Sequence, residues 1–211
     1  MNYETIIKLL PESSLEIIQR LGCNPLTNAP LVCDGVEGPN TKNAVYLPID
    51  KLVAKTSLIA LKELLDGSQE IGGNNRGKFV NKYFRVRQGS SLTKNRGAWC
   101  AAFVTWILNE AIGFRAVWGA IRTVRDHMQT IPISDIKEGD CVSYRSLTRP
   151  FPYGHVGLIV LVEEDCVWTI EGNVDLKPGI DGVAARRLTK ALTRSDKNKA
   201  HQLGRPKGTL K

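Results

Sequence analysis

A change from helix-like to strand-like sequence in the middle of the chain constrains its fold most strongly. In GAWCAAFVTWILNEAIGF, residues 97–114, Phe103, Ile107 and Glu110/Ala111 recur every three to four residues, as on one face of a helix, and Gly113 ends the pattern. The chain continues with EGDCVSYR, GHVGLIVLVEE and CVWTIEGNV, which are rich in the Val, Ile, Thr and aromatic residues typical of strands. We therefore expect an α+β fold with helices packed on an antiparallel sheet.

Three zones are predicted along the chain. Residues 1–65 are expected to form a small helical domain that ends in an apolar helix near Leu52–Leu65. Residues 66–193 are expected to form the α+β domain, which opens with a Gly/Asn-rich loop and a helix. Residues 194–211 are basic and have almost no large apolar side chains, so they predict a flexible tail. The alternative for this tail is a polycationic segment that makes electrostatic contacts with an anionic envelope.

The charge of the chain favours a negatively charged partner. Its 211 residues carry a formal net charge of +8, and the sequence pI is about 9.3. Nucleic acid, anionic lipid and bacterial cell wall all fit this charge. No nucleic-acid recognition motif accompanies it, so we expect no nucleic-acid partner.

The cysteines and the first residues indicate the compartment. The five cysteines are an odd number without a C-x-x-C pair, which disfavours a zinc ribbon or a thioredoxin-like site. We expect reduced thiols and synthesis in the cytosol. The opening MNYETIIKLLPESS lacks a basic segment followed by an apolar one, so no secretory signal is expected. No apolar run reaches the roughly 18 residues of a membrane span. We also expect no cofactor.

Cys100 is the strongest candidate for a nucleophile. It falls in the first turn of the predicted helix, where free backbone N–H groups and the helix dipole favour an anion. Cys141 and Cys166 fall inside predicted strands, where cysteine behaves as a small hydrophobe, and Cys23 and Cys33 lie in the first zone. The alternative is a structural role for Cys100, because free cysteines are most often buried packing residues.

His155 is the candidate base, since it begins the predicted strand HVGLIVLV and can face a cleft. His127 lies on a polar helix-like segment, and His201 lies in the basic tail. If the two strands joined by EED form a tight hairpin, His155 lies opposite Asn173, and Glu171 shares that face because side chains alternate with period two. A carboxylate or amide there would orient the imidazole. A register slip of one residue would break this arrangement.

Four motifs carry a resemblance to a known family. WCAAFV at Trp99–Val104, EGD at Glu138–Asp140, GHVGLIV at Gly154–Val160 and IEGN at Ile170–Asn173 resemble, in order, the CHAP domains of the papain-like superfamily. The resemblance extends over roughly residues 66–188. It implies a papain-like fold and a cysteine peptidase or amidase that cleaves peptidoglycan.

The resemblance also implies a role for each residue of the site. Cys100 is the nucleophile, His155 is the base, Glu171 orients the histidine and Asn173 is a polar fourth member. Some CHAP domains bind calcium through an acidic loop before the cysteine. Here the corresponding region, GNNRGK, has no aspartate, so we expect no calcium and no other metal ion.

Residues around this set have more open roles. The oxyanion would be held by the backbone N–H of Cys100 and by one further donor, for which Asn74 and Asn75 are candidates. Trp99 and Tyr153 are candidates for the substrate groove, although Trp99 could equally belong to the core.

The first zone resembles a second family. IIQRLG at Ile17–Gly22, followed by DGVEGPNTKNAV at Asp34–Val45, is similar to the helical peptidoglycan-binding domains. The continuation AVYLPIDK departs from that pattern, because Pro48 would stop the next helix early. The candidate wall-binding residues are Asp34, Gly35, Gly38 and Thr41.

Together these resemblances predict a peptidoglycan hydrolase, and in particular a monomeric phage endolysin that leaves the cytosol through a holin pore. It would be an N-acetylmuramoyl-L-alanine amidase or an endopeptidase, since pocket residues that would choose between the two bonds are not legible in the sequence. The alternatives are a non-catalytic wall-binding or virion structural protein, an interbacterial effector with the same chemistry, and a nucleic-acid binder.

Overall fold

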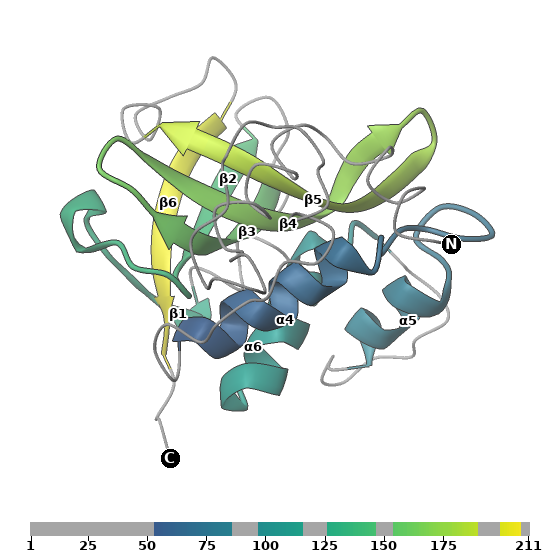
Figure 1. Ribbon diagram of the computed structural model, residues 1–211, viewed down its shortest axis with the longest axis horizontal. Coiled ribbons are helices and arrows are strands. Elements are labelled where there is room, and N and C mark those ends of the chain that lie inside the picture. The colour runs from purple at the N-terminus through teal and green to yellow at the C-terminus, as the bar shows by residue number, and fades with distance from the viewer. Residues whose placement is uncertain (1–52, 86–96, 116–125, 147–153, 190–198, 208–211) are drawn as a thin grey trace, which may run out of the picture.

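The computed structural model describes residues 53–85, 97–115, 126–146, 154–189 and 199–207 (Figure 1). Within these ranges the longer helices are α4 (Val53–Leu65), α5 (Lys78–Phe84) and α6 (Cys100–Ile112). Helix α6 ends at Gly113, whose φ of 69° lies in the left-handed region that favours glycine. The helix predicted from the GAWCAAFVTWIL pattern is therefore confirmed.

The strands form one antiparallel sheet of six strands in the order β1-β6-β2-β3-β4-β5. Their bounds are β1 Met128–Thr130, β2 Cys141–Ser146, β3 Gly154–Val162, β4 Cys166–Lys177, β5 Ile180–Thr189 and β6 Lys199–Pro206, with a short 3-10 helix at Ile133–Asp135. Each of the three segments predicted as strands overlaps β2, β3 or β4, although Glu138–Asp140 precede β2 and Glu163–Glu164 follow β3. The α+β class with an antiparallel sheet is confirmed.

The sheet has an apolar layer on each face. On one face, Phe103 of α6 is buried in a cluster with Leu158 of β3 and Ile170 of β4, and Figure 1 shows α4 and α6 on the same side of the sheet. On the other face, Ile159 and Val167 pack in a smaller cluster. Neighbouring residues of one strand thus enter opposite layers, which is the period-two alternation of a strand covered on both faces.

Helix α4 belongs to the same apolar layer as α6. Ala60, Leu61 and Leu64 of α4 are buried in the cluster that contains Phe103. These three residues fall inside the zone 1–65 that we assigned to a separate domain. The rest of that zone lies outside the described residues, so a separate N-terminal domain stays a prediction.

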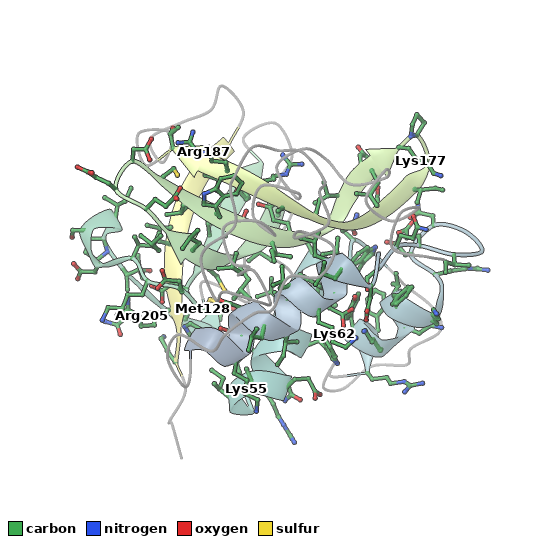
Figure 2. All side chains as sticks on the ribbon, viewed as in Figure 1. Lys55, Lys62, Met128, Lys177, Arg187 and Arg205 are labelled. Atoms are coloured by element: carbon green, nitrogen blue, oxygen red, sulfur yellow. The ribbon has the colours of Figure 1, made fainter. Side chains whose placement is uncertain are left out.

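The expectation of a flexible tail after residue 193 is wrong for residues 199–206. This segment is β6, which pairs with both β1 and β2, and Leu203 is buried in the smaller cluster. Arg205, labelled in Figure 2, donates hydrogen bonds to the nearly buried Asp140 through Nε and Nη2, each at 2.9 Å. β6 is held by one buried apolar side chain, one ion pair and backbone pairing on both of its edges. The basic, polar composition of the segment does not reveal these contacts, and it predicted a solvated tail. Among the described helices, none is long and apolar enough to cross a bilayer.

Candidate active site

Cys100 is the first residue of α6, as predicted. Its thiol is nearly buried, and the residue before it, Trp99, is the N-cap of the helix. The backbone N–H groups of a first helical turn have no partners within the helix, so they favour a thiolate or a developing oxyanion there. The position therefore suits a nucleophile.

The other described cysteines have different surroundings. Cys141 and Cys166 are fully buried within strands. Burial raises the pKa of the Cys141 thiol far above its usual range. Burial, with the hydrogen bond to Glu163, raises the pKa of Cys166 to about 11. Both thiols are held in the unreactive protonated form.

His155 contacts a buried carboxylate. Its Nε2 lies 2.9 Å from Oε2 of Glu171, and Glu171 is almost completely buried. The histidine side chain keeps 23% of its surface exposed, so the imidazole is accessible from one side. Because Nε2 is occupied by Glu171, Nδ1 is the ring nitrogen left to serve Cys100. This arrangement fixes the orientation of the ring and, in the neutral form, its tautomer.

Glu171 is fully partnered in its buried position. Oε1 accepts hydrogen bonds from the hydroxyls of Tyr144, at 3.1 Å, and Thr169, at 2.8 Å. Oε2 faces His155 and also lies 3.3 Å from Nε of Arg186. Burial alone would raise the pKa of Glu171, but His155, Arg186 and Thr169 together hold it below its usual range. Glu171 is therefore a stable anion behind the imidazole.

Cys100 lies close enough to His155 to raise the pKa of the imidazole. Burial alone would lower the pKa of His155, but the charge of the Cys100 thiolate, a hydrogen bond to that sulfur and the Glu171 carboxylate raise it to about 10. At neutral pH the imidazole is then protonated, and it lies beside the Cys100 sulfur. A thiolate–imidazolium pair of this kind can attack a carbonyl and then protonate a leaving group.

The hairpin register that we predicted holds at the two β3–β4 pairs nearest the site, whereas the predicted pairing of His155 with Asn173 is not observed. β3 and β4 pair Leu158 with Ile170 and Ile159 with Thr169, as a tight hairpin through EED requires. A bulge between Ile159 and Leu161 shifts the register only nearer the turn. Glu171 therefore lies on the same face as His155, as the alternation predicted.

Asn173 makes different contacts from those expected. Its Oδ1 accepts a hydrogen bond from the backbone N–H of Trp99, and its Nδ2 donates to Oδ2 of Asp181. The pairing of β4 with β5 is irregular between Glu171 and Val174, and Asn173 has a φ of 63°. Such irregularities re-aim side chains next to functional sites. Here the amide is directed to the start of α6, and a role beside the imidazole stays a prediction.

Trp99 is a core residue and does not line a groove. It has no exposed surface, and its ring stacks on Tyr83 with centroids 5.5 Å apart. Its indole N–H donates to Oε1 of Glu70 at 3.0 Å. Of the two roles that the sequence left open for Trp99, its burial therefore supports the core role. From the sequence, a tryptophan before a nucleophile could be a core residue or line the substrate groove, and only its packing in the structure distinguishes the two roles.

The remaining predicted residues are placed in part. Asn74 is exposed, and the backbone N–H of Asn75 donates to Oε1 of Glu70, so the Asn75 backbone lies beside Trp99. An oxyanion role for either asparagine stays a prediction. Tyr153 and the wall-binding candidates Asp34, Gly35, Gly38 and Thr41 lie outside the described residues.

Sequence reasoning missed several residues of the site. Tyr144, Thr169 and Arg186 all contact Glu171, and Glu70 and Asp181 hold the start of α6. Thr169 could have been found, since it precedes Glu171 by two on the same face of a strand. The others come from segments whose pairing partners are not legible in the sequence.

One cluster outside the site has the composition of a metal site. Glu163, Asp165 and Cys166 lie close together at the β3–β4 turn. The Cys166 thiol and the Trp168 indole both donate to Glu163, and Asp165 pairs with Arg187. These groups are satisfied by one another.

Comparison with known proteins agrees with the geometry. The family model for the CHAP domain matches residues 92–173, which is less than half of the chain. The matched segment includes Cys100, His155, Glu171 and Asn173. No curated protein matches the chain.

Proposed function

We propose that this protein is a cysteine-dependent hydrolase that cleaves an amide bond of peptidoglycan. The observation that carries the proposal is the placement of Cys100 at the start of α6 beside His155, whose other ring nitrogen is held by the buried Glu171. The similarity of residues 92–173 to a CHAP domain supports peptidoglycan as the substrate. The net charge of +8 suits an anionic envelope.

The proposed reaction has two steps. The Cys100 thiolate attacks the amide carbonyl, and the His155 imidazolium gives its proton to the nitrogen as the carbon–nitrogen bond breaks. A thioester on Cys100 remains. Neutral His155 then takes a proton from water, the hydroxide attacks the thioester, and the thiolate leaves. In this proposal, backbone N–H groups at the start of α6 stabilise the oxyanion in both steps.

Digestion of purified peptidoglycan tests the reaction class. Mass spectrometry of the released fragments should show new lactyl and L-alanine ends for an amidase, or new peptide ends for an endopeptidase. Both results agree with amide hydrolysis by the thiolate. New reducing sugar ends would contradict it, because a thiolate–imidazolium pair does not cleave glycosidic bonds by the usual two-carboxylate route.

We also propose that the hydrolase acts as a phage endolysin with a wall-binding N-terminal domain. Co-expression with a holin in a host of matching wall type should cause lysis, and expression of the hydrolase alone should not. An interbacterial effector would instead be inhibited by a dedicated immunity protein. A wall-binding or virion structural protein without catalysis would pull down with peptidoglycan and leave it uncut.

A further inference from the structure

A closed ring of four hydrogen-bonded residues surrounds the start of α6. The backbone N–H of Trp99 donates to Asn173, and the Asn173 amide donates to the Asp181 carboxylate. The backbone N–H of Glu70 donates to the backbone carbonyl of Asp181 at 2.9 Å. The Trp99 indole donates to the Glu70 carboxylate at 3.0 Å, which closes the ring. We call this set the Trp99 ring.

The side of the ring that contains Glu70 and Asp181 is fixed to the sheet. Gln69 forms an antiparallel bridge with Gly182 of β5, and the backbone N–H of Val183 donates to Ser68 at 2.9 Å. A β-carbon on Gly182 would lie 3.1 Å from the Ser68 carbonyl, so glycine permits this close approach. Figure 1 shows the β4–β5 hairpin and the loop that follows α4 at the same side of the molecule. Asp181 and Glu70 are therefore anchored independently of α6.

The side of the ring that contains Asn173 requires an unfavourable backbone conformation. Asn173 sits at an irregularity of β4 with a φ of 63°, a conformation that costs free energy for a residue with a side chain. Both polar groups of its side chain are used in the ring. The contact with Trp99 lies one residue before Cys100.

We propose that the Trp99 ring sets the position of the α6 N-terminus, and that Asp181 and Glu70 are positioning residues for Cys100. Asp181 acts through Asn173 on the Trp99 backbone, and Glu70 acts through the Trp99 indole. The core contacts of Trp99 with Tyr83 and Phe103 keep α6 folded when the ring is opened. Opening the ring then displaces the thiol from the imidazole without unfolding the domain. The catalytic consequence rests on the proposed function, but the positioning of the thiol does not.

The test is the alkylation rate of Cys100 by iodoacetamide at pH 7.5, followed by peptide mapping. Asp181→Ala should slow alkylation about tenfold, because small misplacements at a reacting centre cost factors of ten to a hundred. Asp181→Asn keeps an acceptor for the Asn173 amide and should stay within about threefold of wild type. The control is Asp165→Ala, which removes an exposed carboxylate at the β3–β4 turn and should leave the alkylation rate unchanged.

A double-mutant cycle shows whether Asp181 acts through Asn173. Asn173→Gly removes the side chain and tolerates the positive φ, so it isolates the hydrogen bonds from backbone strain. Asp181→Ala should add no further loss in the Asn173→Gly background. Additive losses, or wild-type alkylation in Asp181→Ala, would overturn the proposal. If Asp181→Ala does not fold, Asn173→Gly alone decides, since wild-type alkylation in this folded variant also overturns it.

The same variants separate this proposal from the proposed function. If the wild type leaves peptidoglycan uncut while Cys100 alkylation follows the cycle, the ring positions the thiol and the assigned substrate is wrong. If the wild type cuts peptidoglycan and Asp181→Ala cuts and alkylates at the wild-type rate, the function stands and the ring has no positioning role.

Discussion

The Glu171 side chain occupies the space that a side chain at Gly157 would fill. A β-carbon on Gly157 would lie 2.7 Å from Cγ and 2.9 Å from Oε1 of Glu171. Glycine at this place in β3 therefore lets the carboxylate cross from β4 to His155, two residues away on the same face. The orientation of the imidazole therefore depends on the absence of a β-carbon two residues further along its own strand.

Gly157→Ala should therefore lower kcat and reduce stability. The new methyl group must push Glu171 off the imidazole, and overpacking of this kind costs about 1–3 kcal/mol. Hydrolysis rates and chemical denaturation measure the two effects. Gly97→Ala is the stability control, since its β-carbon meets nothing within 4 Å. Unchanged kcat in Gly157→Ala would show that Glu171 need not lie where it does.

Glu171→Gln should move the alkaline limit of activity to lower pH. Burial disfavours the charged imidazole, and Cys100 and Glu171 raise the pKa of His155 to about 10, so loss of the carboxylate removes part of the raising effect. The pH profile of kcat/KM should show the shift. In the wild type, the stabilisation from protonated His155 is complete below about pH 6.5 and is lost as pH rises through about 10. If the alkaline side of the kcat/KM profile does not shift in Glu171→Gln, the result contradicts an ion pair between Glu171 and protonated His155.

Asp181→Asn should stabilise the protein at neutral pH. Burial, then the carboxylates of Asp175 and Glu70, raise the pKa of Asp181 to about 6 against the opposing effect of His155. A raised carboxyl pKa costs stability above that pH, and the cost disappears below about pH 3.8. We expect Tm to rise by about 2–4 °C at pH 7.5 and not at pH 3.5. A fall at pH 7.5 would mean that the carboxylate charge is needed for folding.

Arg205→Ala should weaken the attachment of β6. It removes both hydrogen bonds to the buried Asp140, although the backbone N–H of Lys137 still donates to that carboxylate. Because the guanidinium is partly exposed, we expect a loss of about 1–2 kcal/mol in the free energy of unfolding. Arg187→Ala, which breaks the exposed pair with Asp165, is the control and should have no measurable effect. If Arg205→Ala and Arg187→Ala change the free energy of unfolding equally, the pair between Arg205 and Asp140 does not hold β6 in place.

The sequence was informative where structure is local and regular. Helical spacing located α6 and its first residue Cys100, and strand alternation located the hairpin that brings Glu171 to His155. It failed where long-range pairing decides. Leu203 is the only buried apolar side chain of β6 in the described part, and the strand is held by partners more than fifty residues away in the chain.

The contacts of Asn173 could not be predicted for a related reason. Strict alternation ignores the irregularity in β4 that turns this side chain toward Trp99. Asp181 and Glu70 enter the site only through the approach of residues 68–70 to β5, and no local pattern marks that approach. Regular periodicity predicts elements, whereas the groups that position the site lie at departures from it.

The most direct test of the central claim is peptidoglycan hydrolysis by Cys100→Ala beside Cys141→Ala. Both variants remove one buried thiol, but only Cys100 lies at a helix start beside an imidazole. We predict that Cys141→Ala releases fragments at close to the wild-type rate and that Cys100→Ala releases none above background, with both variants folded by circular dichroism. Hydrolysis by Cys100→Ala at the wild-type rate would show that Cys100 is a packing residue and that the reaction is carried out elsewhere.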